Sequence, residues 1–233
     1  MLRVAILAGG LATRLRPITS TIPKALVEVA GKPFIRHQLA YLKEQGVTEV
    51  VMCTGYLGEM IEAEVGGGSE FGLKVSYSPD GEKLLGTGGA LKRALPLLGD
   101  AFFVLYGDSF LPIDFTAVEN DFIASGRTAL MTVLKNDNRW DKSNVIYRDG
   151  KLIEYNKQQT RPDMEYIDYG LSIVRREVFD NTPDHEPFDL AGLYHQLSVT
   201  GQLAGHEVHQ RFYEMGSFEG LKETEAYLAG FEK

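Results

Sequence analysis

A glycine pair followed by two cations has the residue types of a phosphate-binding site. The apolar run of residues 4–8 ends at Gly9-Gly10, and Arg14 and Lys24 follow shortly afterwards. Adjacent glycines let the backbone turn sharply and present its N–H groups to an anion. Arg can hold phosphate oxygens in a bidentate fork, and Lys adds a compact positive charge. This order of residues favours a phosphate site over its alternative, a glycine turn followed by solvated cations.

A carboxylate in the position of a metal ligand occurs later in the chain. Asp108 closely follows the apolar run of residues 101–106. Mg²⁺ prefers oxygen ligands and is usually bound by one or two carboxylates together with phosphates and water. A carboxylate at the end of a buried strand, close to a phosphate site, meets this need. A helix or turn cap is the alternative interpretation of Asp108.

The elements that must position these residues alternate between strand and helix in the first half of the chain. Strands are predicted at residues 4–8, 49–54, 73–78 and 101–106, and helices between Pro33 and Gly46, at residues 59–65 and at residues 88–97. Such alternation predicts βαβ units with a parallel sheet and right-handed crossovers. Because ligands bind beyond the carboxyl ends of such strands, we expect Gly9, Gly55 and Asp108 to border one pocket.

The pattern changes after residue 128. Strands are predicted at residues 129–135 and 167–175, a hairpin with an Asp-Gly turn at 145–155, a helix at 189–200, a short strand at 206–209 and a closing helix at 218–231. No linker rich in Pro or Ser separates the two halves. We therefore expect a single domain over residues 1–233, with halves at 1–128 and 129–233.

Composition limits the classes of function. The chain has 233 residues, of which 44% are hydrophobic, and a formal net charge of −8. That charge argues against a nucleic-acid partner. No apolar run approaches the ~20 residues that span a bilayer and no signal peptide is recognised, so no membrane partner is expected. The single cysteine, Cys53, excludes an internal disulfide and is interpreted as a small buried hydrophobe, which fits a cytoplasmic location.

The N-terminal motif also resembles that of a known family. Residues 7–17, Pro23-Lys24 and residues 31–33 are similar to the signature of the sugar-1-phosphate nucleotidyltransferases, with Ala12 in place of a usual glycine. The resemblance implies a Rossmann-like α/β fold, with a mixed, mainly parallel sheet flanked by helices. It also implies transfer of a nucleoside monophosphate from a triphosphate to a sugar 1-phosphate, with Mg²⁺ as cofactor. A nicotinamide oxidoreductase is excluded, because the glycine spacing after the first strand is wrong.

The family assigns roles to individual residues. It implies that Arg14, Lys24 and Asp108 are catalytic and that Asp108 binds the metal. A second metal ligand is expected at Glu214, where relatives have Asp. The implied nucleotide-binding residues are Leu7, Ala8, Gly9, Gly10, Thr13, Glu82, Thr87 and Gly88.

The base and the sugar are expected to contact different halves. Glu82 could accept hydrogen bonds from both N1–H and N2–H of guanine, which favours GTP; alternatively it faces solvent, and the backbones of Gly9 and Gly88 read a pyrimidine. The implied sugar-phosphate residues are Asn156, Lys157, Tyr169 and Gly170.

The short, single-domain relatives look most similar to this chain. Among them, the heptose- and mannose-1-phosphate guanylyltransferases lead to GTP and one of those sugar phosphates as expected substrates. A homo-oligomer is compatible with this assignment. The alternatives are uridylyl or thymidylyl transfer, and a catalytically weak regulatory homologue, which the departures at Glu214 and Asn156 would permit.

Overall fold

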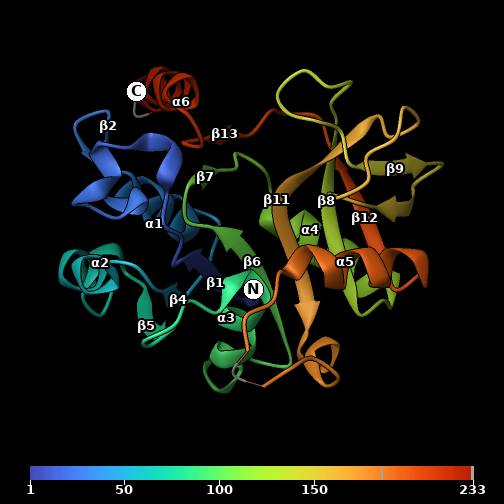
Figure 1. The fold of residues 1–233 in the computed structure, drawn as a ribbon, viewed down its shortest axis with the longest axis horizontal. Coiled ribbons are helices and arrows are strands. Elements are labelled where there is room, and N and C mark those ends of the chain that lie inside the picture. Colours follow the sequence, from blue (N-terminus) through green and yellow to red (C-terminus); the bar gives the residue numbers. More distant parts are fainter. Residues whose placement is uncertain (185, 232–233) are drawn as a thin grey trace.

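A nine-stranded mixed sheet forms the centre of the computed structural model, which describes residues 1–184 and 186–231 (Figure 1). Its strands are β1 (Arg3–Ala8), β4 (Glu49–Thr54), β5 (Lys74–Pro79), β6 (Ala101–Tyr106), β8 (Ala129–Lys135), β9 (Val145–Arg148), β10 (Lys151–Tyr155), β11 (Tyr166–Arg175) and β12 (Leu203–Val208). The order is β10-β9-β11-β6-β1-β4-β5, with β8 also beside β11 and β12 beside β8. Strands β6, β1, β4 and β5 are parallel, whereas β11 runs antiparallel to β6. The expected mixed, mainly parallel α/β sheet is confirmed.

Helices cover both faces of this sheet. They are α1 (Phe34–Glu44), α2 (Gly58–Val65), α3 (Gly86–Ala94), α4 (Phe115–Ser125) and α5 (Leu190–Val199). The last helix, α6 (Phe218–Phe231), packs instead against the two small ladders described below. Successive side chains of a strand point to opposite faces. Val4 and Ile6 of β1 accordingly lie in the core cluster that contains α1 residues, and Ala5 lies in the cluster on the α3 and α5 side. None of the described helices is both long enough and apolar enough to cross a bilayer.

Most predicted boundaries agree with the structure to within two residues. Strand β12 begins at Leu203, three residues before its predicted start. Helix α3 begins at Gly86, two residues before its predicted start. Helix α4 was not predicted at all, although Asp114 caps it by accepting from the backbone N–H groups of Thr116 and Ala117, at 2.8 and 3.2 Å. Cys53 is buried as expected, and burial raises the pKa of its thiol to about 12.

Two small ladders lie outside the main sheet. Strands β2 (Glu28–Val29) and β3 (Lys32–Pro33) form one, and β7 (Ser109–Phe110) and β13 (Tyr213–Glu214) form the other. The second ladder matters for the site, because it joins the segment after β6 to a segment more than a hundred residues later.

Candidate active site

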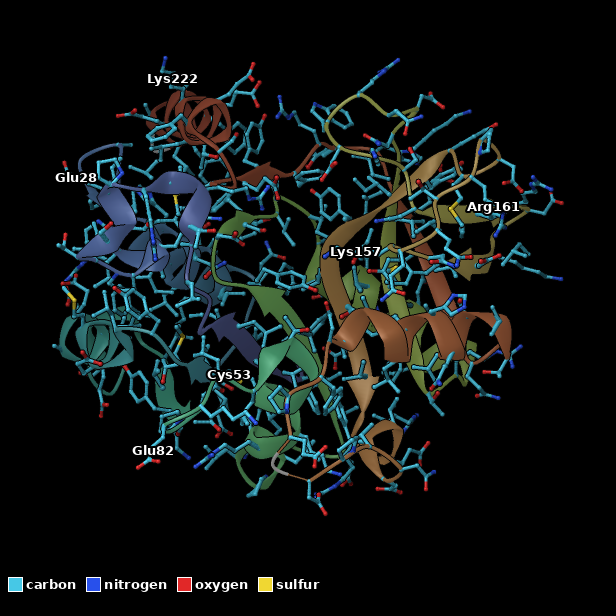
Figure 2. The ribbon with its side chains drawn as sticks, in the orientation of Figure 1. Glu28, Cys53, Glu82, Lys157, Arg161 and Lys222 are labelled. Carbon is cyan, nitrogen blue, oxygen red and sulfur yellow. The ribbon has the colours of Figure 1, made fainter. Side chains whose placement is uncertain are left out.

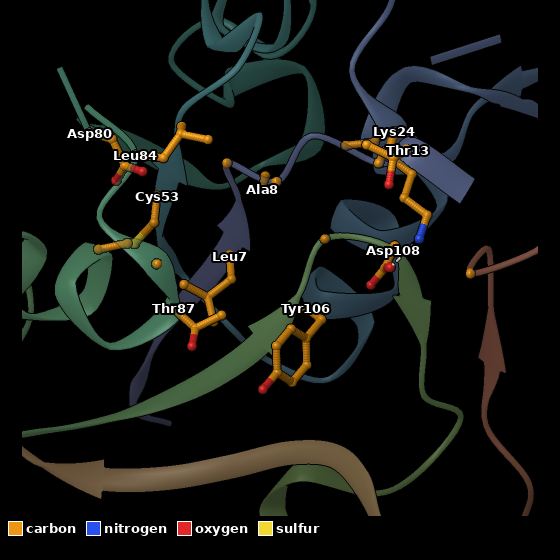
Figure 3. A pocket seen from close by; sticks show the side chains of 18 of the residues that line it. Leu7, Ala8, Thr13, Lys24, Cys53, Asp80, Leu84, Thr87, Tyr106 and Asp108 are labelled. Atoms are coloured by element: carbon orange, nitrogen blue, oxygen red, sulfur yellow. Dashed lines mark hydrogen bonds and ion pairs between the residues drawn. The ribbon is translucent and has the colours of Figure 1, made fainter. Parts of the chain in front are cut away.

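A pocket of about 380 Å³ lies at the carboxyl ends of β1, β4 and β6 (Figure 3). Residues of the Gly-Gly loop and of the segment after it form one wall, and α3 forms another. The lining residues are Leu7, Ala8, Gly9, Gly10, Ala12, Thr13, Arg14, Leu15, Lys24, Ala25, Cys53, Asp80, Leu84, Gly86, Thr87, Ala90, Tyr106, Gly107, Asp108 and Gly216. The predicted convergence of strand ends on one pocket is thus observed for Gly9 and Asp108, whereas Gly55 packs against Gly9 and is not among the lining residues.

Close packing of the strand ends explains the glycines. A Cβ added to Gly55 would lie 2.7 Å from the Gly9 carbonyl oxygen, and one added to Gly107 would lie 3.1 Å from the Leu7 carbonyl oxygen. Side chains at these positions would push the loops apart. The glycines therefore hold the loop after β1 between the loops that follow β4 and β6.

A cation and a carboxylate meet at the mouth of the pocket. The Lys24 Nζ lies 2.5 Å from Asp108 Oδ2, although the two residues are 84 positions apart. Figure 3 shows both side chains directed toward each other, from the short helix of residues 24–26 and from the end of β6. Arg14 lies in another short helix, residues 13–15, and has no ion-pair partner in the part of the chain that the structure describes. Its charge is available to a ligand.

The ladder of β7 and β13 brings Glu214 to the same place. Glu214 pairs with Ser109, and the backbone N–H of Met215 donates to the Asp108 carbonyl at 2.9 Å. Partial desolvation of the carboxyl, and then the Asp108 charge, raise the pKa of Glu214, while Lys24 and Arg14 oppose this shift. Glu214 itself is exposed and outside the pocket lining, but its carboxylate is close enough to Asp108, Lys24 and Arg14 to interact with their charges.

The predicted base-reading residue does not reach the pocket. Glu82 is exposed and does not line the cavity, and Figure 2 shows it at the periphery of the molecule. The reason is local: the Asp80 Oδ2 accepts from the backbone N–H of Leu85 at 3.0 Å, which closes the loop and turns Glu82 outward. Asp80 itself lines the pocket and is 5% exposed.

Asp80 has an unsatisfied oxygen. Its Oδ1 is buried and has no hydrogen-bond partner among the described residues. Burial raises the pKa of this carboxyl, and the Leu85 N–H and the Arg93 charge oppose the shift. Sequence analysis missed Asp80, although an acidic residue directly after the third predicted strand was a usable signal.

Two other predicted base contacts have structural roles. The Thr87 hydroxyl donates to Asp189 at 2.9 Å and accepts from the Leu190 N–H at 2.8 Å, so it connects α3 to the start of α5. A Cβ on Gly88 would lie 2.1 Å from the Phe188 ring, and its N–H already donates to the Phe188 carbonyl. Thr87 lines the pocket, whereas Gly88 does not; Gly86, with φ +71°, takes its place.

The predicted sugar-phosphate residues all lie outside the pocket lining. Asn156 and Tyr169 are engaged in contacts within the protein, whereas Lys157 and Gly170 stay available to a ligand. The Asn156 Oδ1 accepts from the backbone N–H groups of residues 158 and 159, so it closes a turn. The Tyr169 ring is 2% exposed and packs against Phe212 in the core. Lys157 is exposed, has no ion-pair partner among the described residues, and lies near the centre of the view in Figure 2. Gly170, with φ +105°, lies beside Tyr106.

Asn144 organises this side of the site and was not predicted. Its Oδ1 accepts from the Asp168 N–H at 2.9 Å, and its carbonyl accepts from the Asn156 N–H at 2.8 Å. It therefore holds the end of β10 against β11. A single Asn before a strand carries no signal from which this role could have been read.

Comparison with known proteins places this fold and site in a family. The family model described as nucleotidyl transferase matches residues 3–150, which is more than half of the chain. The chain therefore belongs to the nucleotidyl transferase family.

Particular relatives cover nearly the whole chain. The N-acetylmuramate alpha-1-phosphate uridylyltransferase of Neisseria meningitidis is 33% identical and is matched over 98% of this chain and 99% of its own length. The D-glycero-alpha-D-manno-heptose 1-phosphate guanylyltransferase of Campylobacter jejuni is 30% identical, over 80% and 82%. Among solved structures, HddC from Yersinia pseudotuberculosis complexed with GMP-PN has a TM-score of 0.81 at 26% identity, covering 98% of this chain and all of that chain.

Proposed function

We propose that this protein transfers a nucleoside monophosphate, with GTP as the preferred donor, to a sugar 1-phosphate such as heptose or mannose 1-phosphate. The products are a nucleoside diphosphate sugar and pyrophosphate. The observation that carries this proposal is the meeting of Lys24 and Asp108 at 2.5 Å beside the Gly9-Gly10 loop, in a pocket that Arg14 also lines.

The chemistry requires positioning and charge rather than a general base. A phosphate monoester has a second pKa of about 6, so the attacking oxygen of the sugar phosphate is mostly ionised at neutral pH. It attacks the α-phosphorus, and the bond to the pyrophosphate oxygen breaks. Lys24, Arg14 and the backbone N–H groups of the loop hold the triphosphate and offset the charge that develops on its oxygens. The structure accordingly needs no nucleophilic side chain.

The carboxylates fit a divalent metal. Desolvation, and then repulsion by Asp108, raise the pKa of Glu214, and a cation bound between the two carboxylates would relieve that repulsion. Two carboxylates with phosphate oxygens and water are a usual set for Mg²⁺. We propose these two residues as its ligands. Bound there, Mg²⁺ would neutralise charge on the phosphate oxygens.

The base proposal rests on Asp80. A buried acceptor without a partner costs free energy, which a ligand donor would recover. Guanine offers adjacent N1–H and N2–H donors, whereas uracil offers one donor between two carbonyl oxygens that would repel a carboxylate. The likeness to a solved guanylate complex supports the same choice. We therefore assign to Asp80 the contact with the base that the sequence analysis expected of Glu82.

The sugar phosphate is proposed to bind in the second half, residues 129–233, with its phosphate near Lys157. This cation is exposed and has no ion-pair partner among the described residues, and Gly170 brings its strand close to Tyr106 at the pocket wall. The first half, residues 1–128, would bind the nucleotide.

A matrix of GTP, UTP, dTTP, CTP and ATP against several sugar 1-phosphates, read by pyrophosphate release, tests the proposal. We expect the highest kcat/KM with GTP and a heptose or mannose 1-phosphate. The near full-length match to the Neisseria enzyme favours a second candidate, uridylyl transfer to N-acetylmuramate 1-phosphate. A preference for that pair would change the assigned substrates but not the assigned reaction. Absence of pyrophosphate release with every pair would contradict the enzymatic proposal and favour a binding protein.

A further inference from the structure

The side chain of Gln38 on α1 connects both ends of the turn that carries Asp108. Strand β6 ends at Tyr106 and β7 begins at Ser109, so Gly107 and Asp108 form a two-residue turn between them (Figure 3). The Gln38 Nε2 donates to the Tyr106 carbonyl at 2.9 Å and to the Ser109 carbonyl at 2.8 Å. The donors of one amide are therefore engaged on both sides of Asp108.

This amide has one favourable orientation. Its nitrogen donates and its oxygen only accepts, so an amide turned over would direct its oxygen at two carbonyl oxygens. In the observed orientation the Gln38 Oε1 is buried and has no hydrogen-bond partner among the described residues, and the residue is 3% exposed. A buried acceptor without a partner costs free energy. The net contribution of this side chain to stability is therefore smaller than its two hydrogen bonds alone would give, which favours a role in positioning.

Gln38 belongs to a row of polar side chains on α1. Residues 38, 41 and 45 are spaced by three and four positions, which places them along one face of a helix. The Tyr41 hydroxyl donates to the Ile113 carbonyl at 3.1 Å, and the Gln45 Oε1 accepts from the Phe115 N–H at 3.0 Å. The row holds the chain from the end of β6 to the start of α4 against α1. Within this row, Gln38 holds the turn between β6 and β7.

The contact extends to the second carboxylate that is proposed to bind the metal. Ser109, whose carbonyl accepts from Gln38, pairs with Glu214 in the ladder of β7 and β13. The Met215 N–H donates to the Asp108 carbonyl at 2.9 Å, which connects the same two segments again. A displaced turn would therefore change the position of Asp108 relative to Glu214. Mg²⁺ demands near-ideal octahedral geometry, so its affinity depends on that relative position.

We propose that Gln38 is a positioning residue for the divalent metal, because its two hydrogen bonds set the position of Asp108 relative to Glu214. The inference rests on the proposed function and deepens it. Gln38 lies outside the pocket lining, so it acts through the backbone of residues 106–109 and not by touching a substrate. Groups that hold metal ligands in place typically contribute roughly 10- to 100-fold to metal affinity. A contact to the backbone belongs at the lower end of this range.

Metal binding measures this role without turnover and without a nucleotide. Gln38→Met keeps an unbranched side chain of similar length and removes both donors. Mn²⁺ is the probe, because it takes the same oxygen ligands as Mg²⁺ and its free form is counted by electron paramagnetic resonance. Asp108→Asn defines the binding elsewhere on the protein. We expect Gln38→Met to bind Mn²⁺ about 10-fold more weakly than wild type. Equal affinities, or wild type that binds no more Mn²⁺ than Asp108→Asn, would overturn the proposal.

A matched control separates positioning from stability. Tyr41→Phe removes one hydrogen bond between the same face of α1 and a more distant part of the same segment. It should lower the free energy of unfolding in urea and keep the wild-type affinity for Mn²⁺. If Tyr41→Phe weakened Mn²⁺ binding as much as Gln38→Met, the loss would come from general loosening of α1, and the proposal would fail.

Turnover supplies a second measurement. In Gln38→Met, the Mg²⁺ concentration for half-maximal pyrophosphate release should rise about 10-fold. At saturating Mg²⁺, kcat should stay within about threefold of wild type, because excess metal restores the arrangement of the carboxylates. A kcat that stays far below wild type at saturating Mg²⁺ would contradict a role through the metal.

Failure of the proposed function gives a different result. Absence of pyrophosphate release with every substrate pair would refute the enzymatic proposal, while the Mn²⁺ affinities would still test Gln38. Conversely, active enzyme with equal Mn²⁺ affinities in wild type and Gln38→Met would refute only the positioning proposal. If Gln38→Met does not fold, Gln38→Leu, which also lacks donors and has a shorter side chain, takes its place with the same expected loss.

Discussion

Lys24 and Asp108 form an ion pair at 2.5 Å, with side chains that are 16% and 29% exposed, and both residues line the pocket at the carboxyl ends of β1, β4 and β6. The pair joins the segment after the Gly-Gly loop to the end of β6, so it aligns two parts of the site before any ligand arrives. The pair also places a cation directly beside the carboxylate that is proposed to bind the metal.

Asp108→Asn should lower kcat/KM by about 10²-fold, comparable to the loss of one strong electrostatic contact. The substitution keeps the shape of the side chain and removes its charge, so folding should persist. Pyrophosphate release at saturating Mg²⁺ measures the effect, and circular dichroism checks the fold. Asp100→Asn, at an exposed residue near the other end of β6, is the matched control. Near-normal turnover of Asp108→Asn would remove Asp108 from the active site.

Glu214→Ala should shift the Mg²⁺ titration to higher concentrations, whereas Glu214→Asp, which restores the commoner family residue, should retain activity. Both follow if Glu214 and Asp108 share one cation. Glu219→Ala, on the exposed first turn of α6, should leave the titration unchanged. A wild-type Mg²⁺ requirement in Glu214→Ala would mean that Asp108 binds the metal without it.

Asp80→Asn should lose about 1–3 kcal/mol of discrimination between GTP and UTP, the value of a good bidentate base contact. The ratio of kcat/KM values for the two triphosphates measures it. Glu82→Gln is the internal control, since Glu82 is exposed and outside the pocket lining, and its ratio should match wild type. A change in the Glu82 variant alone would return the base contact to Glu82.

Thr87→Val should lower the free energy of unfolding by about 1–2 kcal/mol, because Asp189 and the Leu190 N–H would each lose a partner. Urea denaturation measures the change. The preference for GTP over UTP should persist, since the Thr87 hydroxyl is engaged within the protein. An altered base preference at unchanged stability would contradict this role.

Asp168 should make the free energy of unfolding depend on pH. Burial raises its pKa from 3.8 to about 6, with the Gly170 N–H and Lys157 opposing the shift. The folded state thus holds the proton more tightly, so the contribution of this group is fully present below pH 4 and is lost as pH rises through 6. The difference between wild type and Asp168→Asn should change by roughly 1–3 kcal/mol over this range, since part of the side chain reaches solvent. Parallel pH profiles would contradict it.

The sequence was most informative where local physics decides the structure. The buried runs of β1 and β6 end at glycines, so their bounds and the convergence of Gly9 and Asp108 could be predicted. Helix α4 had the same kind of signal, a capping Asp114 and a terminal Gly126, and was overlooked.

The sequence was least informative where competing hydrogen bonds, either nearby or distant in sequence, decide which side chain is available. Glu82 and Asp80 have the same chemistry, and only the closed loop between Asp80 and Leu85 turns one inward and the other outward. Thr87 is engaged by α5, about a hundred residues later. Asn156 closes a turn of its own. Periodicity and motif spacing contain no information about such competition for hydrogen bonds.

The antiparallel pairing of β11 with β6 has a mechanical consequence. Both halves of the chain contribute to one hydrogen-bonded sheet, and neighbouring strands lie about 4.8 Å apart. In the proposed function, the two substrates therefore meet across a single strand spacing that cannot widen without breaking backbone hydrogen bonds. The sheet therefore resists a hinge motion between the halves, so larger or smaller sugars must be accommodated by side chains and loops. Engineering a new acceptor preference should accordingly begin with the loops at residues 136–144 and 156–165 and leave the backbone pairing of the sheet unchanged.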